Sequence, residues 1–64
     1  MNTATYRGMA ESAEKHLDWH AAAKFWNLAI AKYPGKGSLA GIDLQKMVAR
    51  MNAAKAMARQ QDAT

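Results

Sequence analysis

The sequence predicts an all-α fold, with three helices in one small domain that covers residues 1–64. Apolar residues recur at intervals of three and four over most of the chain, which is the period of an amphipathic helix. β-Branched residues are few and no stretch alternates between apolar and polar residues, so no strand is expected. The Pro-Gly cluster from Pro34 to Gly37 predicts one loop, and Ser38 is a candidate cap for the helix after it.

The first helix is predicted at about residues 4–16, with Thr3 as a candidate N-cap. Arg7, Glu11 and Lys15 follow one another at four-residue steps on its polar side, where opposite charges support a helix. Gly8 falls near the outer face and costs up to about 1 kcal/mol there. The apolar stripe consists of Tyr6, Met9, Ala10, Ala13 and Leu17.

The second helix, at residues 18–33, is predicted to be the centre of the fold. Asp18 is its expected N-cap, and the near absence of a linker forces an antiparallel hairpin with the first helix. Apolar residues lie on two of its sides, so two neighbouring helices are expected. One side carries Trp19, Ala22, Ala23, Trp26, Ile30 and Tyr33, and the other carries Ala21, Phe25 and Leu28.

The third helix is predicted at about residues 39–59, with Leu44, Met47, Val48, Met51, Ala54 and Ala58 in one apolar arc. Gly41 interrupts its start, where Asp43 is a possible later cap. The polar residues 60–64 are expected to be disordered. The predicted core consists of Tyr6, Met9, Trp19, Ala22, Trp26, Ile30, Met47 and Met51.

Composition restricts the possible functions. No nucleophile–base motif or phosphate-binding loop is visible, and so short a chain leaves little room for a walled active site, so an enzyme is not expected. His16 and His20 are four residues apart, but the predicted turn between them prevents them from sharing a helix face. The chain has no cysteine, so neither a metal nor a cofactor is expected. No apolar run reaches the ~20 residues of a membrane span and no secretory signal is visible, which predicts a cytoplasmic protein.

The small size predicts association. A chain of 64 residues buries too little surface to gain more than about a few kcal/mol from its core, so a homodimer or a protein complex is expected. Phe25 and Leu28 are the apolar residues that a partner would cover, together with Met57, which falls off the third helix's arc. Lys24, Lys32 and Arg50 are predicted to form the charged rim of this partner-binding surface.

The net charge of +4 comes entirely from the second half of the chain. This asymmetry favours an acidic partner and makes a DNA-binding third helix the alternative function, with Lys46, Arg50, Lys55 and Arg59 as candidate contacts. However, the first two point nearly opposite to the last two, whereas a recognition helix gathers its contacts on one face.

The hairpin resembles one tetratricopeptide repeat. Asp18, Trp19, Ala22, Trp26, Ala29, Ile30 and Pro34 fall on the repeat's second-helix positions, and Tyr6, Met9, Ala10 and Ala13 on those of its first helix. Leu17 stands where the repeat has a glycine. The resemblance covers one repeat, so it implies the geometry of the hairpin and no tetratricopeptide function.

Residues 6–31 also resemble the ANR family, the small AraC negative regulators of enteric bacteria and their phages. The matching residues are Tyr6, Met9, Ala10, Ala13, Trp19, Ala22, Ala23, Trp26 and Ala29. Many members end in a Trp-Ala…Arg…Phe-Cys pattern, where this chain has Leu44 to Arg50 and no cysteine. The resemblance implies a non-enzymatic regulator that contacts an AraC-type activator or a nucleoid-associated protein and blocks it by occlusion. A phage-encoded inhibitor of a host machine would need the same surface and is a further alternative.

Overall fold

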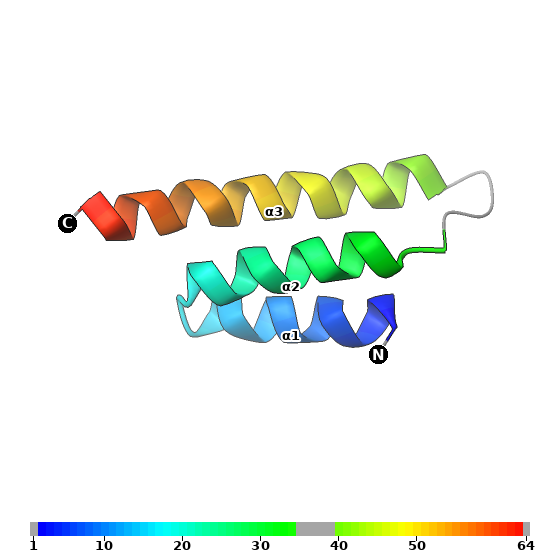
Figure 1. The fold of residues 1–64 in the computed structure, drawn as a ribbon, viewed down its shortest axis with the longest axis horizontal. Coiled ribbons are helices and arrows are strands. Elements are labelled where there is room, and N and C mark those ends of the chain that lie inside the picture. The colour runs from blue at the N-terminus through cyan, green and yellow to red at the C-terminus, as the bar shows by residue number, and fades with distance from the viewer. Residues whose placement is uncertain (1, 35–39, 64) are drawn as a thin grey trace.

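The computed structural model describes residues 2–34 and 40–63, which form three helices and no strand (Figure 1). Helix α1 spans Thr3–Lys15, α2 spans Trp19–Lys32 and α3 spans Ala40–Ala63. The predicted all-α fold is thus confirmed. The predicted loop with its Ser38 cap, and residue 39 as the start of the third helix, lie outside the described residues.

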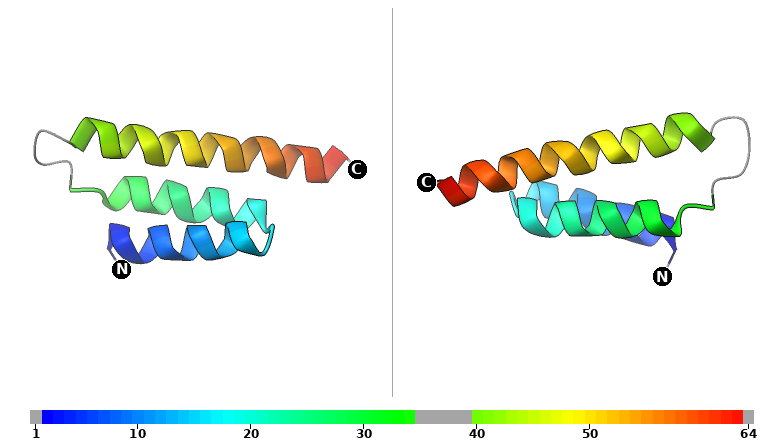
Figure 2. Two further views of the ribbon diagram at one scale, coloured as in Figure 1. Left: turned by 180° about the vertical axis from the view of Figure 1, so that it is seen from behind. Right: turned by 45° about the horizontal axis from the view of Figure 1, so that its top comes forward.

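Helix α2 lies between the other two helices and runs antiparallel to both (Figures 1 and 2). It packs extensively against α1 and against α3, whereas α1 and α3 contact each other far less. The molecule is therefore an elongated layer of helices, with extents of 42 × 20 × 16 Å. Helix α2 therefore has two neighbours, as expected, but Phe25 and Leu28 on its second apolar side are only half-buried, so that side is not fully covered.

Local capping explains where the hairpin helices begin. Asn2 rather than Thr3 caps α1, because its Oδ1 accepts a 2.9 Å hydrogen bond from the Thr5 backbone N–H. Asp18 caps α2, as predicted, by accepting a 3.3 Å hydrogen bond from the Ala21 backbone N–H. Between the helices Leu17 adopts a left-handed conformation with φ of 58°. Glycine adopts this conformation more readily than other residues, but the chain has leucine at this position.

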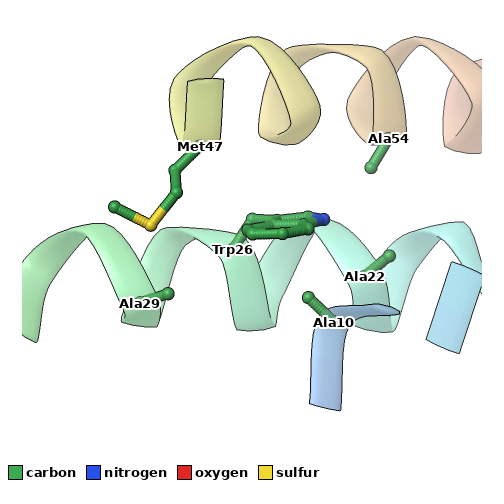
Figure 3. Packing of buried hydrophobic residues seen from close by; sticks show 6 residues of the cluster. All are labelled: Ala10, Ala22, Trp26, Ala29, Met47 and Ala54. Carbon is green, nitrogen blue, oxygen red and sulfur yellow. The ribbon is translucent and has the colours of Figure 1, made fainter. Parts of the chain in front are cut away.

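The core is built around one indole ring. Trp26 on α2 is only 2% exposed and Met47 of α3 packs from the opposite helix (Figure 3). Fully buried alanines fill the remaining contacts: Ala10 of α1, Ala22 and Ala29 of α2, and Ala54 of α3. Because an alanine side chain is a single methyl group, the helix axes can approach closely at each of these positions.

Most of the predicted core residues reach this cluster. Ala22, Trp26 and Met47 are buried in it, and Tyr6, Trp19, Ile30 and Met51 are partly buried and pack against it. Met9 is half-buried beside the core and lines a groove instead.

The end of α3 differs from the prediction. Residues 60–63 were expected to be disordered, but α3 continues to Ala63. Two contacts with the hairpin accompany this last turn: the Gln61 Nε2 donates a 2.9 Å hydrogen bond to the Leu17 carbonyl, and His20 Nε2 lies 3.0 Å from Asp62 Oδ1. The prediction of disorder used only the polarity of these residues. It missed their hydrogen-bond partners, which lie more than forty positions earlier in the chain. At the other end, Asp43 lies inside the first turn of α3 rather than capping it, and accepts a 3.3 Å hydrogen bond from the Tyr33 hydroxyl.

Candidate functional site

The main candidate site is a groove between α1 and α2, here called the α1/α2 groove. Its apolar lining comes from Met9 and Ala13 of α1 and from Ala21 and Phe25 of α2. Ser12, His16 and Asp18 complete the lining. Phe25 is half-buried and also packs against the core, so its ring is shared between the fold and the groove.

Leu28 and two lysines extend this surface along α2. Leu28 lies three residues after Phe25, next to it on the helix, and is half-buried without belonging to the core cluster. Lys24 and Lys32 are exposed at the two positions four residues before and after Leu28. Three residues of the predicted partner-binding surface therefore lie beside Phe25 along α2: Lys24, Leu28 and Lys32. We call Ala21, Phe25 and Leu28 the α2 strip.

Arg50 and Met57 were predicted to join this surface, and the structure does not place them there. Arg50 lies over the Trp26 ring, with its Cζ 5.0 Å from the ring centroid. Trp26 and Leu28 point to nearly opposite sides of α2, because two residues correspond to about 200° of an α-helix. Met57 lies on the same side of α3 as Arg50, seven residues further on, and is 38% exposed. The rim of the α2 strip therefore consists of the two lysines without Arg50.

Arg50 instead belongs to a cluster that joins all three helices. The Trp26 Nε1 donates a 3.0 Å hydrogen bond to Glu14 Oε2, and Arg50 donates from Nε and Nη2 to the same carboxylate. Burial alone would raise the pKa of Glu14, but the hydrogen bonds from Arg50 and Trp26 and the charge of Arg50 outweigh it and lower the pKa. The hydrogen bond to Glu14 in turn raises the pKa of Arg50. The cluster is stable in its charged form at neutral pH.

A second groove lies beside this cluster, between α1 and α3. Arg7 and Glu11 line it from α1, and Asp43, Lys46 and Arg50 line it from α3, with Trp26 and Met47 at its base. Acidic and basic side chains are mixed here, and Glu14 already pairs with Arg50. The groove thus offers no concentrated charge of either sign.

The four cations proposed for DNA contact are all exposed, but they do not share a face. Lys46 and Arg50 line the second groove, whereas Lys55 and Arg59 point away from it on the far side of α3. The two pairs of cations therefore lie on opposite sides of α3, as the helical spacing predicts.

The histidines have other contacts. His16 Nδ1 lies 2.8 Å from the Ser12 carbonyl oxygen, and His20 pairs with Asp62. Within residues 2–34 and 40–63 no group of three histidine or acidic side chains is arranged to hold a metal ion. None of the described helices combines the length and the hydropathy that crossing a membrane requires.

Comparison with known proteins adds no relative: no family model, no curated protein and no solved structure matches the chain. The resemblance to the ANR family stays a prediction from residues 6–31.

Proposed function

We propose that this protein is a small non-enzymatic regulator that binds a protein partner and blocks its activity by covering a surface. The partner class that the ANR resemblance implies is an AraC-type activator or a nucleoid-associated protein. One observation carries the proposal. The α2 strip leaves Phe25 and Leu28 partly open to solvent between Lys24 and Lys32, and Leu28 points to the side of α2 away from Trp26.

The strip has the composition of a protein interface. An apolar centre with aromatic and aliphatic side chains and a charged rim is the usual anatomy of such a surface. The α1/α2 groove is open, and two antiparallel helices form its sides. A groove of this kind suits a helix laid along it. Small-molecule sites are concave and more enclosed, so the geometry favours a macromolecular partner.

Self-association and the tetratricopeptide-like geometry of the hairpin form part of the same proposal. Met57 is 38% exposed on α3, away from the α2 strip, and supports a separate seam between two copies. Sedimentation of the wild type and of Met57→Lys would test this seam. We expect a dimer that the substitution dissociates, and a monomeric wild type would contradict it.

The function is tested by direct binding to purified AraC-type activators and nucleoid-associated proteins, measured by calorimetry. Leu28→Asp removes the centre of the strip outside the core cluster, and we expect it to weaken binding by about tenfold or more. Ala49→Asp, at an exposed position of α3, is the matched control and should bind within about twofold of the wild type. Circular dichroism establishes that both variants are folded. A wild type that binds none of these proteins, or a Leu28→Asp variant that binds normally, would refute the proposal.

DNA binding by α3 is the competing function, and it draws on the exposed Lys55 and Arg59. Protection of a defined DNA site, with an affinity that falls steeply as salt is added, would favour it over protein binding.

A further inference from the structure

Within α2 itself, the charged side chains beside the α2 strip have one sign. Between Trp19 and Lys32 the formally charged side chains are Lys24 and Lys32, and no acidic residue occurs in α2. Both lysines are exposed and flank Leu28 on the helix. An incoming surface therefore meets apolar atoms at the centre and two positive charges at the edge.

The acidic residues of α1 are directed elsewhere. Glu14 is bonded to Trp26 and Arg50, and Glu11 lines the groove between α1 and α3. The carboxylate that does line the α1/α2 groove is that of Asp18, at the hairpin turn, and it accepts the capping hydrogen bond from Ala21. Across the described part of α1 and α2, no carboxylate is thus placed to neutralise Lys24 and Lys32.

The surface formed by the α1/α2 groove and the α2 strip matches a helix of three to four turns in length. The groove is lined from residues 9–16 and 18–25, and Leu28 and Lys32 continue the surface along α2, so that it is about 20 Å long. Helix α3 packs against α2 where Met47 and Ala54 lie near Trp26 (Figure 3). The α1/α2 groove is lined by other residues of α2, Ala21 and Phe25, and by no residue of α3. A helix could therefore lie against α1 and α2 without displacing α3.

We infer that the α1/α2 groove binds an acidic amphipathic helix of the partner, apolar on the face that enters and carrying Asp or Glu along its flanks. This inference rests on the protein-binding function proposed above and specifies the partner's chemistry. A second copy of the chain fits this surface less well, because it would bring the same pair of lysines against the first pair, at a cost from like charges.

Three synthetic helical peptides of about 18 residues test the inference. They share one Leu/Ala stripe and differ only in their flanks, which are Glu, Gln or Lys. Each is titrated into the ¹⁵N-labelled full chain and followed by NMR. We expect the amide shifts to map to the α1/α2 groove, with the Glu peptide binding about tenfold or more tightly than the Lys peptide and the Gln peptide between them. About 0.5 M salt should remove most of this difference.

Charge reversal in the protein provides the control. The double variant Lys24→Glu/Lys32→Glu should invert the order of the peptides. Lys55→Glu/Arg59→Glu changes the net charge by the same amount on the far side of α3 and should keep the wild-type order. If both double variants behave alike, the preference comes from overall charge and the inference is overturned.

Other results would also overturn it. These are three peptides of equal affinity, shifts that map to α3, no binding by any peptide, or a self-associated chain that Leu28→Asp dissociates. Failure here is distinguishable from failure of the proposed function. If the activator binds and Leu28→Asp weakens it while the peptides show no charge order, only the acidic-helix inference is lost. If the peptides rank as expected but no regulator binds, only the proposed partner class is lost.

Discussion

The indole Nε1 of Trp26 donates a 3.0 Å hydrogen bond to the carboxylate of Glu14, twelve residues earlier in the chain. This bond gives the most buried large side chain of the core a polar contact on α1, and Arg50 of α3 covers the same ring. One aromatic side chain therefore contacts all three helices. A buried indole N–H without an acceptor would cost about 1–3 kcal/mol, so Glu14 is needed where it is.

Replacing the indole tests how much the fold depends on it. We expect Trp26→Phe to lower the free energy of unfolding by about 1–3 kcal/mol, because it leaves a void and removes the donor to Glu14. Urea denaturation followed by circular dichroism measures the change. Trp19→Phe, at a partly buried ring on the same helix, should cost less. Equal losses in the two variants would show that Trp26 has no special role.

The ion pair between Glu14 and Arg50 should contribute modestly. Arg50 has a side chain that is 51% exposed, so solvent screens the attraction, although the Glu14 side chain is only 16% exposed. A double-mutant cycle with Glu14→Gln and Arg50→Gln should give a coupling energy of about 0.5–1.5 kcal/mol. A coupling energy near zero would mean that the geometry of the pair carries no stability.

Stability should depend on pH through Glu14. Because folding lowers the pKa of this carboxyl, the folded state binds its proton less readily than the unfolded state. The stabilisation is therefore complete above the unfolded pKa and is lost as the pH falls through the folded pKa, that is, below the ordinary pKa of a glutamate, 4.5. Urea denaturation at a series of pH values should show a decline on acidification that is shallower in Glu14→Gln. An identical decline in both proteins would assign it to other carboxyls.

Gly8 offers a stabilising substitution. It lies in the middle of α1, is exposed, and a Cβ atom there would meet nothing within 4 Å. Gly8→Ala should raise the free energy of unfolding by about 0.5–1 kcal/mol, because alanine restricts the unfolded chain and favours the helix. Gly41→Ala, which is equally open but lies at the second residue of α3, should gain less. Thermal denaturation compares the two, and a loss of stability in Gly8→Ala would contradict the open space around it.

The buried alanines should not tolerate larger side chains. Ala22 is fully buried within the core cluster, so Ala22→Leu should destabilise the fold by about 1–3 kcal/mol through overpacking. Ala49→Leu, on the exposed side of α3, makes the same chemical change and should alter stability by less than about 0.5 kcal/mol. Comparable effects of the two changes would mean that the helices can separate to make room.

Periodicity predicted what depends on local sequence. The three helices, the Asp18 cap and the central position of α2 follow from apolar spacing and capping chemistry, and the structure has all of them. What it did not predict depends on partners far along the chain. Arg50 was assigned to the rim of Phe25 and Leu28 because its charge was considered without Glu14, which lies 36 positions earlier. A usable signal was present, since a buried tryptophan needs an acceptor and Glu14 is adjacent to the first helix's apolar stripe.

The candidate site was predictable only in part for the same reason. Helical spacing put Phe25, Leu28, Lys24 and Lys32 on one side of α2, and they are there. Whether another helix covers them depends on the tilt and position of α1 and α3, which no local pattern encodes. The continuation of α3 to Ala63 likewise accompanies contacts of Gln61 and Asp62 with the hairpin.

The left-handed conformation of Leu17 has a consequence for the order of events during synthesis. This leucine is 62% exposed, so no burial of its side chain repays a backbone conformation that costs about 1 kcal/mol or more. Its carbonyl oxygen receives the Gln61 side chain, which leaves the ribosome long after the first two helices. Until then the turn at Leu17 lacks this hydrogen bond and depends on bonds within the hairpin, such as the 3.0 Å hydrogen bond that the Leu17 backbone N–H donates to the Glu14 carbonyl. The hydrogen bond from the Gln61 side chain to the Leu17 carbonyl can form only after the last turn of α3 has been synthesised.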